Sequence, residues 1–469
     1  MTAQGYGNRV IRLHDTALGR STDVALRDAG KVSMYVCGPT VYDVPHIGHA
    51  RMTLVFDVLR RYLEWSGLDV RFVSNITDID DKIIRRANKE GRSPSDVAVE
   101  YEGAWYDAMD RLGVLRPTVD PHATDYVEPM VELVGRLVAA GKAYETSDGV
   151  YLGIDAVPGY GVLARQSLDS LRSGARIDVV DEKRSPLDFA LWKKAKPDEP
   201  TWSSPWGAGR PGWHTECVVM SLDLLGEGFD LHVGGIDLAF PHHENERAQA
   251  VADGKEFARH WAHCGHVQVA GEKMAKSLGN FRTLHDLFQT VDPRAYRVVV
   301  LQSHYRAPVE VTAATLEQAA NTLGGLDGFA RRAAGLPSAG ADSAALGRFR
   351  AAMDDDLDTP RAMAELSRLV RSANTALEAG DRYDAAPMAA AVREMAAALG
   401  LELRGGENDV PPDVAALVAR RGQARVGRDF TGADALRAQI EGLGWTVEDT
   451  AQGPRIHRKS TRDTADRGW

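Results

Sequence analysis

The chain has 469 residues, 44% of them hydrophobic, which is too large for one ordinary core, so we expect two to four domains. It has no apolar run of about 18 residues and no apolar signal region at its start, which argues against a membrane-spanning helix and makes the cytoplasm the expected location. Its three scattered cysteines exclude a disulfide framework and favour buried, catalytic or metal-bound thiols. The net charge of -10 argues against indiscriminate nucleic-acid binding, but residues 420–469 hold ten Lys/Arg and seven Asp/Glu, so a basic end follows an acidic body.

The first predicted unit is a strand, a loop and a helix. An apolar run at residues 32–36 precedes the loop CGPTVYDVPHIGH at 37–49, and residues 51–65 place apolar side chains at helical spacing. Helix N-termini present unpaired N–H groups and suit phosphate, and the glycines of the loop permit close backbone approach. His46 and His49, three apart, can both face such a ligand. Taken alone, the same pattern also fits a turn with solvated or core histidines.

A second predicted strand at residues 69–75 ends just before Thr77. Strands and helices that alternate at this spacing predict a parallel, doubly wound sheet, which binds ligands beyond the carboxyl ends of its strands. Thr40, Thr77 and the two histidines would all lie at that edge.

Residues 95–145 are predicted to be helical, and the stretch 150–212, rich in Gly and Pro, is predicted to be an irregular insertion. The sheet resumes at residues 229–235, and residues 241–252 form a helix with a proline in its first turn.

This last helix carries half of a possible metal site. His242 and Glu246 are four residues apart and so face one side of the helix. With the thiolates of Cys37 and Cys217 they are chemically sufficient for zinc, and a doubly wound fold can bring the four together. The spacing is unlike two compact CxxC pairs, so the alternative is two buried apolar cysteines beside a solvated helix start. Cys264 is interpreted as core.

A second loop that suits phosphate follows at residues 273–280, KMAKSLGN, with lysines at 273 and 276 and a glycine after the hydroxyl. Beyond it, helices are predicted at 292–301 and 313–334, a linker at 335–340, and alanine-rich amphipathic helices at 342–400. A further linker at 404–412 leads to a small basic unit at 413–469, predicted to hold two helices and two short strands.

In this order and at this distance, the loops at 37–49 and 273–280 resemble the paired HIGH and KMSKS motifs of class I aminoacyl-tRNA synthetases. Four further segments narrow the resemblance to the cysteinyl-tRNA synthetase family and extend it over nearly the whole chain. They are YVCGPTVYD at 35–43, NITDIDDK at 75–82, GWHTEC at 212–217 and FPHHENE at 240–246. One departure is Ala275, where the family usually has serine, and we expect a modest effect on closure of the loop.

The resemblance implies a class I, Rossmann-like catalytic domain at 1–301 (insertion about 120–212, KMSKS-type loop 273–277), a helical domain on the stem and anticodon side at 302–404, and a basic anticodon-binding domain at 405–469. It implies ATP-dependent activation of L-cysteine with Mg²⁺, and transfer of the cysteinyl group to the terminal adenosine of tRNA(Cys) by a cytoplasmic enzyme, for which we expect a monomer. The implied catalytic residues are His46, His49, Thr40, Lys273 and Lys276; ATP contacts come from His46, Gly48, His49 and Lys276; substrate contacts come from Gly38, Thr77, Trp213 and Asp237; the zinc ligands are Cys37, Cys217, His242 and Glu246.

Zinc would answer a selectivity problem, because serine differs from cysteine by one atom. A site that requires one polar contact can reject an analogue by about 10⁴-fold, as sister synthetases do, and zinc prefers thiolate to a protonated alcohol. We therefore expect the substrate's sulfur to become a further zinc ligand. Trp213 as a pocket wall and Asp237 as a contact of the substrate amine each have a purely structural alternative.

Two alternative functions remain at this point. The related mycothiol-pathway ligase joins cysteine to an amino sugar through the same adenylate, but it has no tRNA for a basic C-terminal unit to hold. A non-catalytic RNA-binding relative would have no reason to retain both nucleotide motifs with four candidate ligands. In the basic unit, Arg428, Trp445 and Asp449 are candidates to read unstacked anticodon bases, with Trp445 as ordinary core the competing interpretation.

Overall fold

We describe a computed structural model of the chain, which covers residues 11–166, 182–197, 199–269, 271–274, 282–404, 412–427, 429–443, 445–450 and 453–458. Among these residues, no helix is long and apolar enough to cross a membrane.

The centre of the molecule is a four-stranded sheet in which every strand is parallel to its neighbours, as the sequence predicts. Its strands, in spatial order, are β10 (His260–Cys264), β9 (Leu231–Gly235), β3 (Lys31–Val36) and β4 (Asp69–Ser74). Val36 lies opposite both Ser74 and Val233, so the ends of β3, β4 and β9 reach the same edge. The chain runs from β3 outward to β4 on one side and arrives at β9 on the other, so the switch point for ligand binding falls between β3 and β9.

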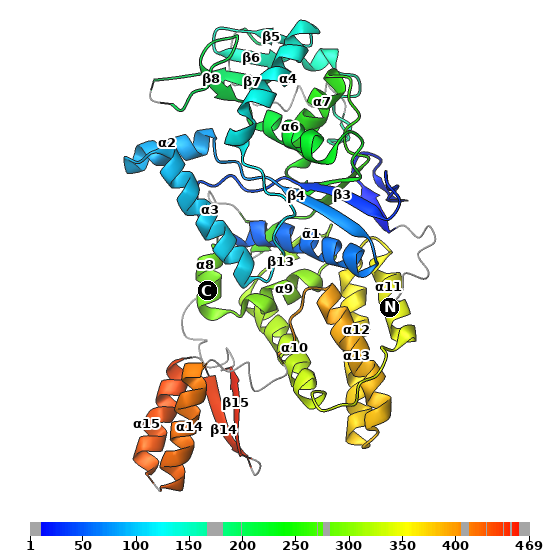
Figure 1. Ribbon diagram of the computed structural model, residues 1–469, viewed down its shortest axis with the longest axis vertical. Coiled ribbons are helices and arrows are strands. Elements are labelled where there is room, and N and C mark those ends of the chain that lie inside the picture. The colour runs from blue at the N-terminus through cyan, green and yellow to red at the C-terminus, as the bar shows by residue number, and fades with distance from the viewer. Residues whose placement is uncertain are drawn as a thin grey trace.

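The alternation of side chains along β3 explains why helices cover both faces of the sheet. Met34 and Val36 belong to the apolar core shared with α1 (Ile47–Trp65) and α9 (Pro293–Leu301), whereas Tyr35 belongs to the core shared with α6 (Trp213–Leu225). In Figure 1, α1 lies below β3 and β4, and α6 and α7 (Glu244–Ala252) lie above them. A π-helical turn at Ala239–His243 precedes α7, so the predicted helix at 241–252 begins less regularly than expected.

The chain between β4 and β9 first forms α2 (Asp81–Glu90) and α3 (Pro94–Arg111), of which α3 packs in the core with α1. It then forms a second, smaller layer above the sheet (Figure 1), with short 3₁₀ turns at Ala123–Tyr126 and Ile154–Ala156, α4 (Val127–Ala139), β5 (Ala143–Glu145), β6 (Gly149–Leu152), β7 (Phe189–Lys194) and β8 (Gly209–Pro211). The four strands form an antiparallel sheet in sequence order. The prediction of an irregular stretch at 150–212 was therefore wrong for β6, β7 and β8. Their signal is weak in the sequence because each is short and they are separated by long Gly- and Pro-rich connections.

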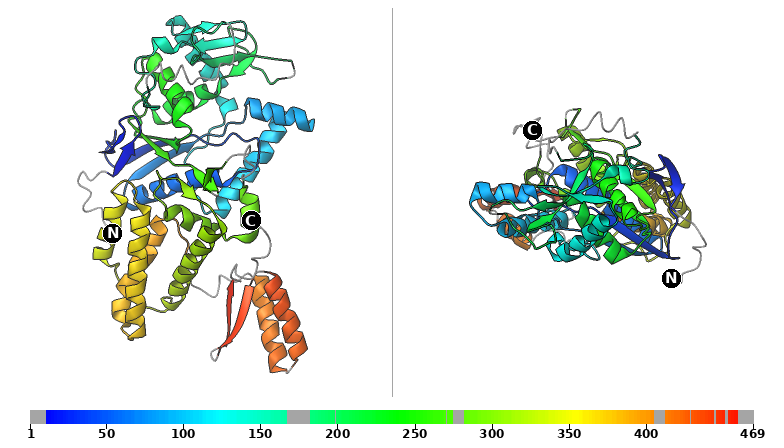
Figure 2. Two further views of the ribbon diagram at one scale, coloured as in Figure 1. Left: turned by 180° about the vertical axis from the view of Figure 1, so that it is seen from behind. Right: turned by 90° about the horizontal axis from the view of Figure 1, so that it is seen from above.

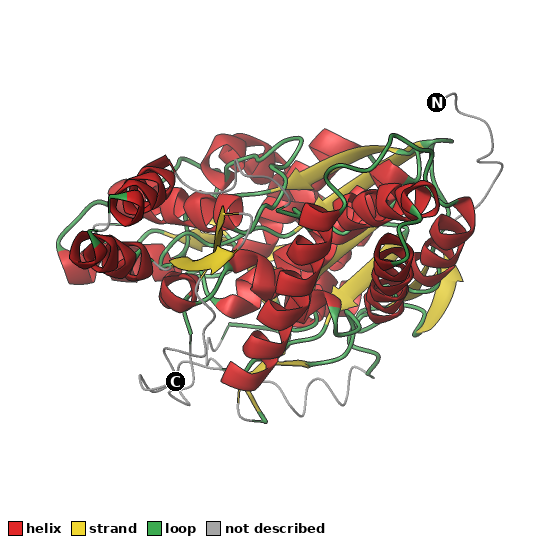
Figure 3. Ribbon diagram, turned by 90° about the horizontal axis from the view of Figure 1, so that it is seen from below, coloured by secondary structure: helices red, strands yellow, loops and turns green. Residues whose placement is uncertain are grey.

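The part of the chain that follows β10 is mostly helical and lies below the sheet (Figures 1 and 3). It contains β11 (Val267–Val269), β12 (Glu272–Lys273), α8 (Leu284–Thr290), β13 (Val309–Glu310), α10 (Ala313–Arg332), α11 (Ser343–Met353), α12 (Thr359–Glu378) and α13 (Arg382–Ala398). At the start of the chain, β1 (Arg12–Asp15) and β2 (Arg20–Asp23) form an antiparallel hairpin.

The C-terminal unit lies at the lower end of the molecule, as the view from behind in Figure 2 also shows. It consists of α14 (Pro412–Val426), α15 (Phe430–Gly442) and an antiparallel pair, β14 (Trp445–Thr450) and β15 (Gly453–Arg458), which are the two helices and two strands predicted. Trp445 is 8% exposed and packs with Val414, Val418 and Ile440. Its role is therefore core packing, and in this conformation its ring is not presented to a base. Arg428 lies outside the described residues.

Candidate active site

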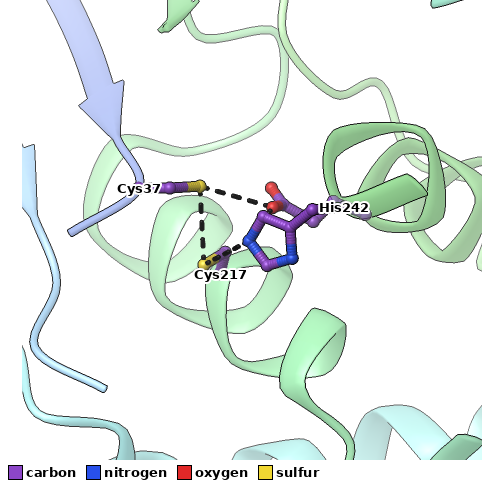
Figure 4. A group of neighbouring side chains, drawn as sticks. Cys37, Cys217 and His242 are labelled. Atoms are coloured by element: carbon purple, nitrogen blue, oxygen red, sulfur yellow. Dashed lines mark hydrogen bonds and ion pairs between the residues drawn. The ribbon is translucent and has the colours of Figure 1, made fainter. Parts of the chain in front are cut away.

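Four side chains from separate parts of the chain meet beyond the carboxyl end of β3. Cys37 directly follows that strand, Cys217 comes from α6 and His242 from the π-helical turn (Figure 4), and Glu246 comes from α7. All four are buried, and one ligand atom from each lies within 4.8 Å of the others. The structure thus brings together the four residues predicted as metal ligands.

The distances in this cluster suit a tetrahedral ion. The sulfurs of Cys37 and Cys217 are 3.7 Å apart, Cys37 Sγ is 3.4 Å from Glu246 Oε1, and Cys217 Sγ is 3.7 Å from the His242 ring. Bonds of about 2.3 Å from zinc to sulfur place two sulfur ligands about 3.8 Å apart in a tetrahedron. The contact of His242 Nε2 with Glu246 Oε1, at 2.8 Å, is the shortest of these contacts, whereas the contacts through sulfur are long, weak hydrogen bonds. The donor set of two thiols, an imidazole and a carboxylate therefore fits zinc in both chemistry and spacing.

The charges of the cluster depend on one another. Burial lowers the pKa of His242, but Glu246 and Cys217 outweigh it and raise the pKa to about 10. Burial acts to raise the pKa of Glu246, yet His242 and His232 hold it well below its ordinary value. Burial raises the pKa of Cys37. The hydrogen bond between Cys37 and Cys217 lowers the pKa of Cys217. Cys217 is thus the thiol more ready to ionise, as metal ligation requires.

Two histidines behind the ligands were not identified from the sequence. His232 on β9 places Nε2 2.8 Å from Glu246 Oε2, and the Nδ1 atoms of His214 and His242 are 2.8 Å apart. Burial lowers the pKa of His214 well below its ordinary value, so its neutral ring can accept from His242 Nδ1–H. In this structure the Nε2–H of His242 donates to Glu246 Oε1 at 2.8 Å. With a metal bound, the same hydrogen bond to His214 would leave the Nε2 of a neutral His242 ring to act as the ligand atom.

The segment after β4 forms one wall next to the cluster. The hydroxyl of buried Thr77 donates to Glu216 at 2.8 Å and accepts from the Asn75 amide at 3.1 Å, and the N–H of Gly38 donates to the same amide's oxygen at 2.9 Å. Thr40 and Thr77 pair as a short parallel bridge. The sequence analysis did not identify Asn75 or Glu216 as site residues, although they lie in the segments NITDIDDK and GWHTEC.

The other predicted substrate contacts lie at different depths. Trp213 is half-buried and stacks on the ring of His242, with the centroids 4.0 Å apart. Asp237 is exposed, two residues beyond β9, at the same edge of the sheet. Trp213 therefore contacts a predicted metal ligand, whereas Asp237 is exposed just beyond the end of β9.

The histidine motif caps the first helix of the sheet. His46 is the N-cap of α1, where its Nδ1 accepts from the N–H of His49 at 3.2 Å, and the Nδ1 of His49 faces the N–H of His46 at 3.4 Å. The two rings stack with centroids 3.5 Å apart. Since Nδ1 accepts in each ring, the proton of a neutral ring lies on Nε2, which makes both residues donors.

The described residues that flank the undescribed part of the lysine motif lie close to the histidine motif. The N–H of Ile47 donates to Arg282 at 3.2 Å, and Leu284 donates to Pro45 at 2.9 Å. A side chain added at Gly48 would meet Met274 at 3.3 Å. Lys273 is exposed on β12. Ala275 and Lys276 lie outside the described residues.

The comparisons with known proteins agree with this geometry. Residues 24–321 match the family model described as the catalytic domain of class I tRNA synthetases (C), and residues 348–404 match a DALR domain. A cysteine–tRNA ligase from Halorhodospira halophila is 45% identical to the chain, over 96% of the chain and all of the relative. The chain belongs to the cysteine–tRNA ligase family.

Further relatives support the same family. The ligases of Trichlorobacter lovleyi and Thermus thermophilus are 43% and 44% identical to this chain, over 94% of it and 98% of their own lengths. Among solved structures, methionyl-tRNA synthetase of Mycobacterium tuberculosis with methionyl-adenylate has a TM-score of 0.59 at 16% identity, covering 79% of this chain and 89% of its own, which is a likeness of fold alone. The chain is thus a class I aminoacyl-tRNA ligase, and both alternatives drawn from the sequence are disfavoured.

Proposed function

We propose that this ligase activates L-cysteine with ATP and transfers the cysteinyl group to the 3′-terminal adenosine of tRNA(Cys), as a cytoplasmic monomer. The observation that carries the proposal is the buried cluster of Cys37, Cys217, His242 and Glu246, which lies beyond the strand that leads into the histidine motif. A thiophilic site next to a phosphate-binding helix start suits a substrate that carries both a thiol and a carboxylate to be activated.

The four residues of the cluster would hold one zinc ion. Zinc bound there supplies a thiophilic centre that favours a thiolate over an alcohol, which is the selection that cysteine needs against serine. The protein itself prepares the site, because Cys217 has a lowered pKa and His214 orients the His242 ring. Trp213 covers one side through its stacking on His242 and restricts the pocket to a short side chain.

In the first step, the carboxylate of cysteine attacks the α-phosphate of ATP, which binds with Mg²⁺, and pyrophosphate leaves. The Nε2–H groups of His46 and His49 would donate to the phosphates as negative charge builds up. Gly48 leaves room for the nucleotide at the helix start, where an added side chain would meet His46 at 3.0 Å. Lys273 and Lys276 would neutralise the departing pyrophosphate, Thr40 would contact the phosphates beside the histidines, and the attacking carboxylate, already ionised, needs no general base.

The substrate is positioned by groups at the same sheet edge. Gly38 and Thr77 line the wall of the pocket, with Thr77 held by Glu216. Asp237, exposed at the approach, would contact the amino group of cysteine. In the second step, the hydroxyl of the terminal adenosine attacks the cysteinyl carbonyl and AMP leaves. The helical domain and the basic C-terminal unit would hold the stem and anticodon of the tRNA.

The test is transfer of labelled cysteine, with ATP and Mg²⁺, to transcribed tRNA(Cys), run beside a reaction that offers the amino sugar of the mycothiol pathway. We expect cysteinyl-tRNA and no sugar product. Transfer to the sugar alone would overturn the tRNA assignment but leave the activation chemistry in place.

The role of the metal is tested by measuring the zinc content and the amino-acid preference of the wild-type protein and two cysteine variants. Wild type and Cys264→Ala should each contain about one zinc per chain, because Cys264 is a core residue away from the cluster. Cys217→Ala should lose the zinc and the preference for cysteine over serine. A Cys217→Ala protein that kept stoichiometric zinc would contradict the proposed ligand set.

A further inference from the structure

Lys82 is a cation beside Tyr42 and Trp213 that the proposed mechanism does not use. It is exposed in the first turn of α2, and its Nζ lies 5.3 Å from the centre of the Tyr42 ring and 5.8 Å from the centre of the Trp213 ring. Trp213 in turn stacks on His242. The ammonium group therefore lies near one ring from the histidine-motif loop and one from α6, and the second of these rings stacks on a predicted metal ligand.

The two neighbouring cations, Lys193 and Arg210, are both paired with Asp81. Asp81 pairs with Lys193 of β7 at 2.7 Å and also with Arg210 of β8. Lys82 makes no ion pair with any carboxylate in the part of the chain that the structure describes. Asp81 thus anchors the inserted sheet to the start of α2, and Lys82, one residue later, presents its charge beside that junction.

We propose that Lys82 binds a phosphodiester of the single-stranded 3′ end of the tRNA as this end enters the pocket. This inference rests on the proposed function and adds to it a contact for the polyanionic partner. Two aromatic rings beneath an ammonium group favour its charge while leaving its outer side open to an anion.

The position of Lys82 favours the tRNA over the small substrates. The phosphates of ATP are expected at the N-terminus of α1, and the thiol of cysteine at the buried cluster, each with its own set of partners. Lys82 is exposed outside Trp213, on the side where the inserted sheet meets the catalytic domain. In this proposal the 3′ end of the tRNA runs along this junction and passes Lys82.

The experiment compares Lys82→Met, Lys82→Arg and the control Lys89→Met, which removes an exposed lysine near the other end of the same helix. Two reactions are measured: cysteine-dependent exchange of pyrophosphate into ATP, which needs no tRNA, and charging of transcribed tRNA(Cys). Binding is measured for full-length tRNA and for tRNA without its terminal CCA, over a range of salt concentrations.

For Lys82→Met we expect unchanged exchange, about tenfold weaker binding of full-length tRNA, and a slope of log affinity against log salt that is less steep by about 0.7. Lys82→Arg should restore most of the binding, Lys89→Met should behave as wild type, and tRNA without CCA should bind wild type and Lys82→Met equally.

Three results would overturn the proposal. A loss of exchange, or a raised KM for cysteine, in Lys82→Met would assign Lys82 to holding Trp213. Unchanged tRNA binding, or an equal loss with truncated tRNA, would exclude a contact with the 3′ end. Wild-type protein that performed exchange but charged no tRNA would overturn both the proposed function and this inference.

Discussion

Gly38 provides the sharpest test of how the site is assembled, because its position leaves no room for a side chain. A Cβ atom added there would lie 1.6 Å from the backbone oxygen of Asn75 and 2.7 Å from the carbon of the same carbonyl. Both are backbone atoms, so no rotation of a side chain relieves the overlap. Gly38→Ala must therefore push the loop after β3 away from the loop after β4.

The size of the displacement follows from ordinary contact distances. Contact becomes normal near 3.4 Å, so the two loops must separate by about 1.8 Å. Such a shift breaks the bond from the Gly38 N–H to Asn75 and the pairing of Thr40 with Thr77. A misplacement of about 1 Å can cost about 10²-fold in rate. We expect kcat/KM for pyrophosphate exchange to fall at least that far, equivalent to about 2.7 kcal/mol.

The matched control is Gly103→Ala, on the exposed side of α3, where an added Cβ meets nothing within 4 Å. Removing a glycine from a helix interior should stabilise that protein by up to about 1 kcal/mol and leave exchange unchanged. Circular dichroism and thermal unfolding would establish that Gly38→Ala is folded. A folded Gly38→Ala protein with exchange within threefold of wild type would refute the reasoning.

Three further predictions concern stability. Arg297→Met should lower the free energy of unfolding by about 2 kcal/mol in urea titrations, because the buried Asp57 loses Arg297, 2.6 Å away, and keeps the more exposed Arg61 at 2.9 Å; a loss below 1 kcal/mol would contradict this. Partial burial opposes the charge on His122, but its hydrogen bond to Glu102 outweighs this and raises the pKa of His122. The stabilisation is therefore complete below the ordinary value of 6.5 and is lost as pH rises through the folded-state pKa, so Glu102→Gln should be less stable than wild type at pH 5.5 and nearly equal at pH 8.5; an equal deficit at both values would show a pH-independent cause. Trp445→Ala should unfold the small C-terminal unit and expose it to proteolysis, whereas Trp445→Phe should keep both the unit and its tRNA affinity; a folded Trp445→Ala protein with weak tRNA binding would favour a direct contact with a base.

Most of the central sheet could be predicted from local pattern. Strands β3, β4 and β9 are apolar runs followed by turn residues, which is the signal of a buried parallel strand. Strand β10 was missed because its sequence, HWAHC, has two histidines that look solvated until their burial is known. In the structure His260 approaches Asp15 and His263 bonds to Thr16, so partners from the N-terminal hairpin make these polar residues compatible with the core.

The residue pairs on single helices are local features, and the sequence alone was sufficient to predict them. Histidines three apart at a helix start, and His242 and Glu246 four apart on one helix face, have that geometry wherever the helix lies. The meeting of Cys37 with Cys217, 180 residues later, depends on the sheet order, because β9 returns beside β3 and brings α6 and α7 to its end. Other features likewise exist only in the folded chain, because each depends on partners that no local spacing specifies. They are the contacts of His214 and His232 with the predicted metal ligands, the burial of Trp445 and the placement of Lys82 near two rings.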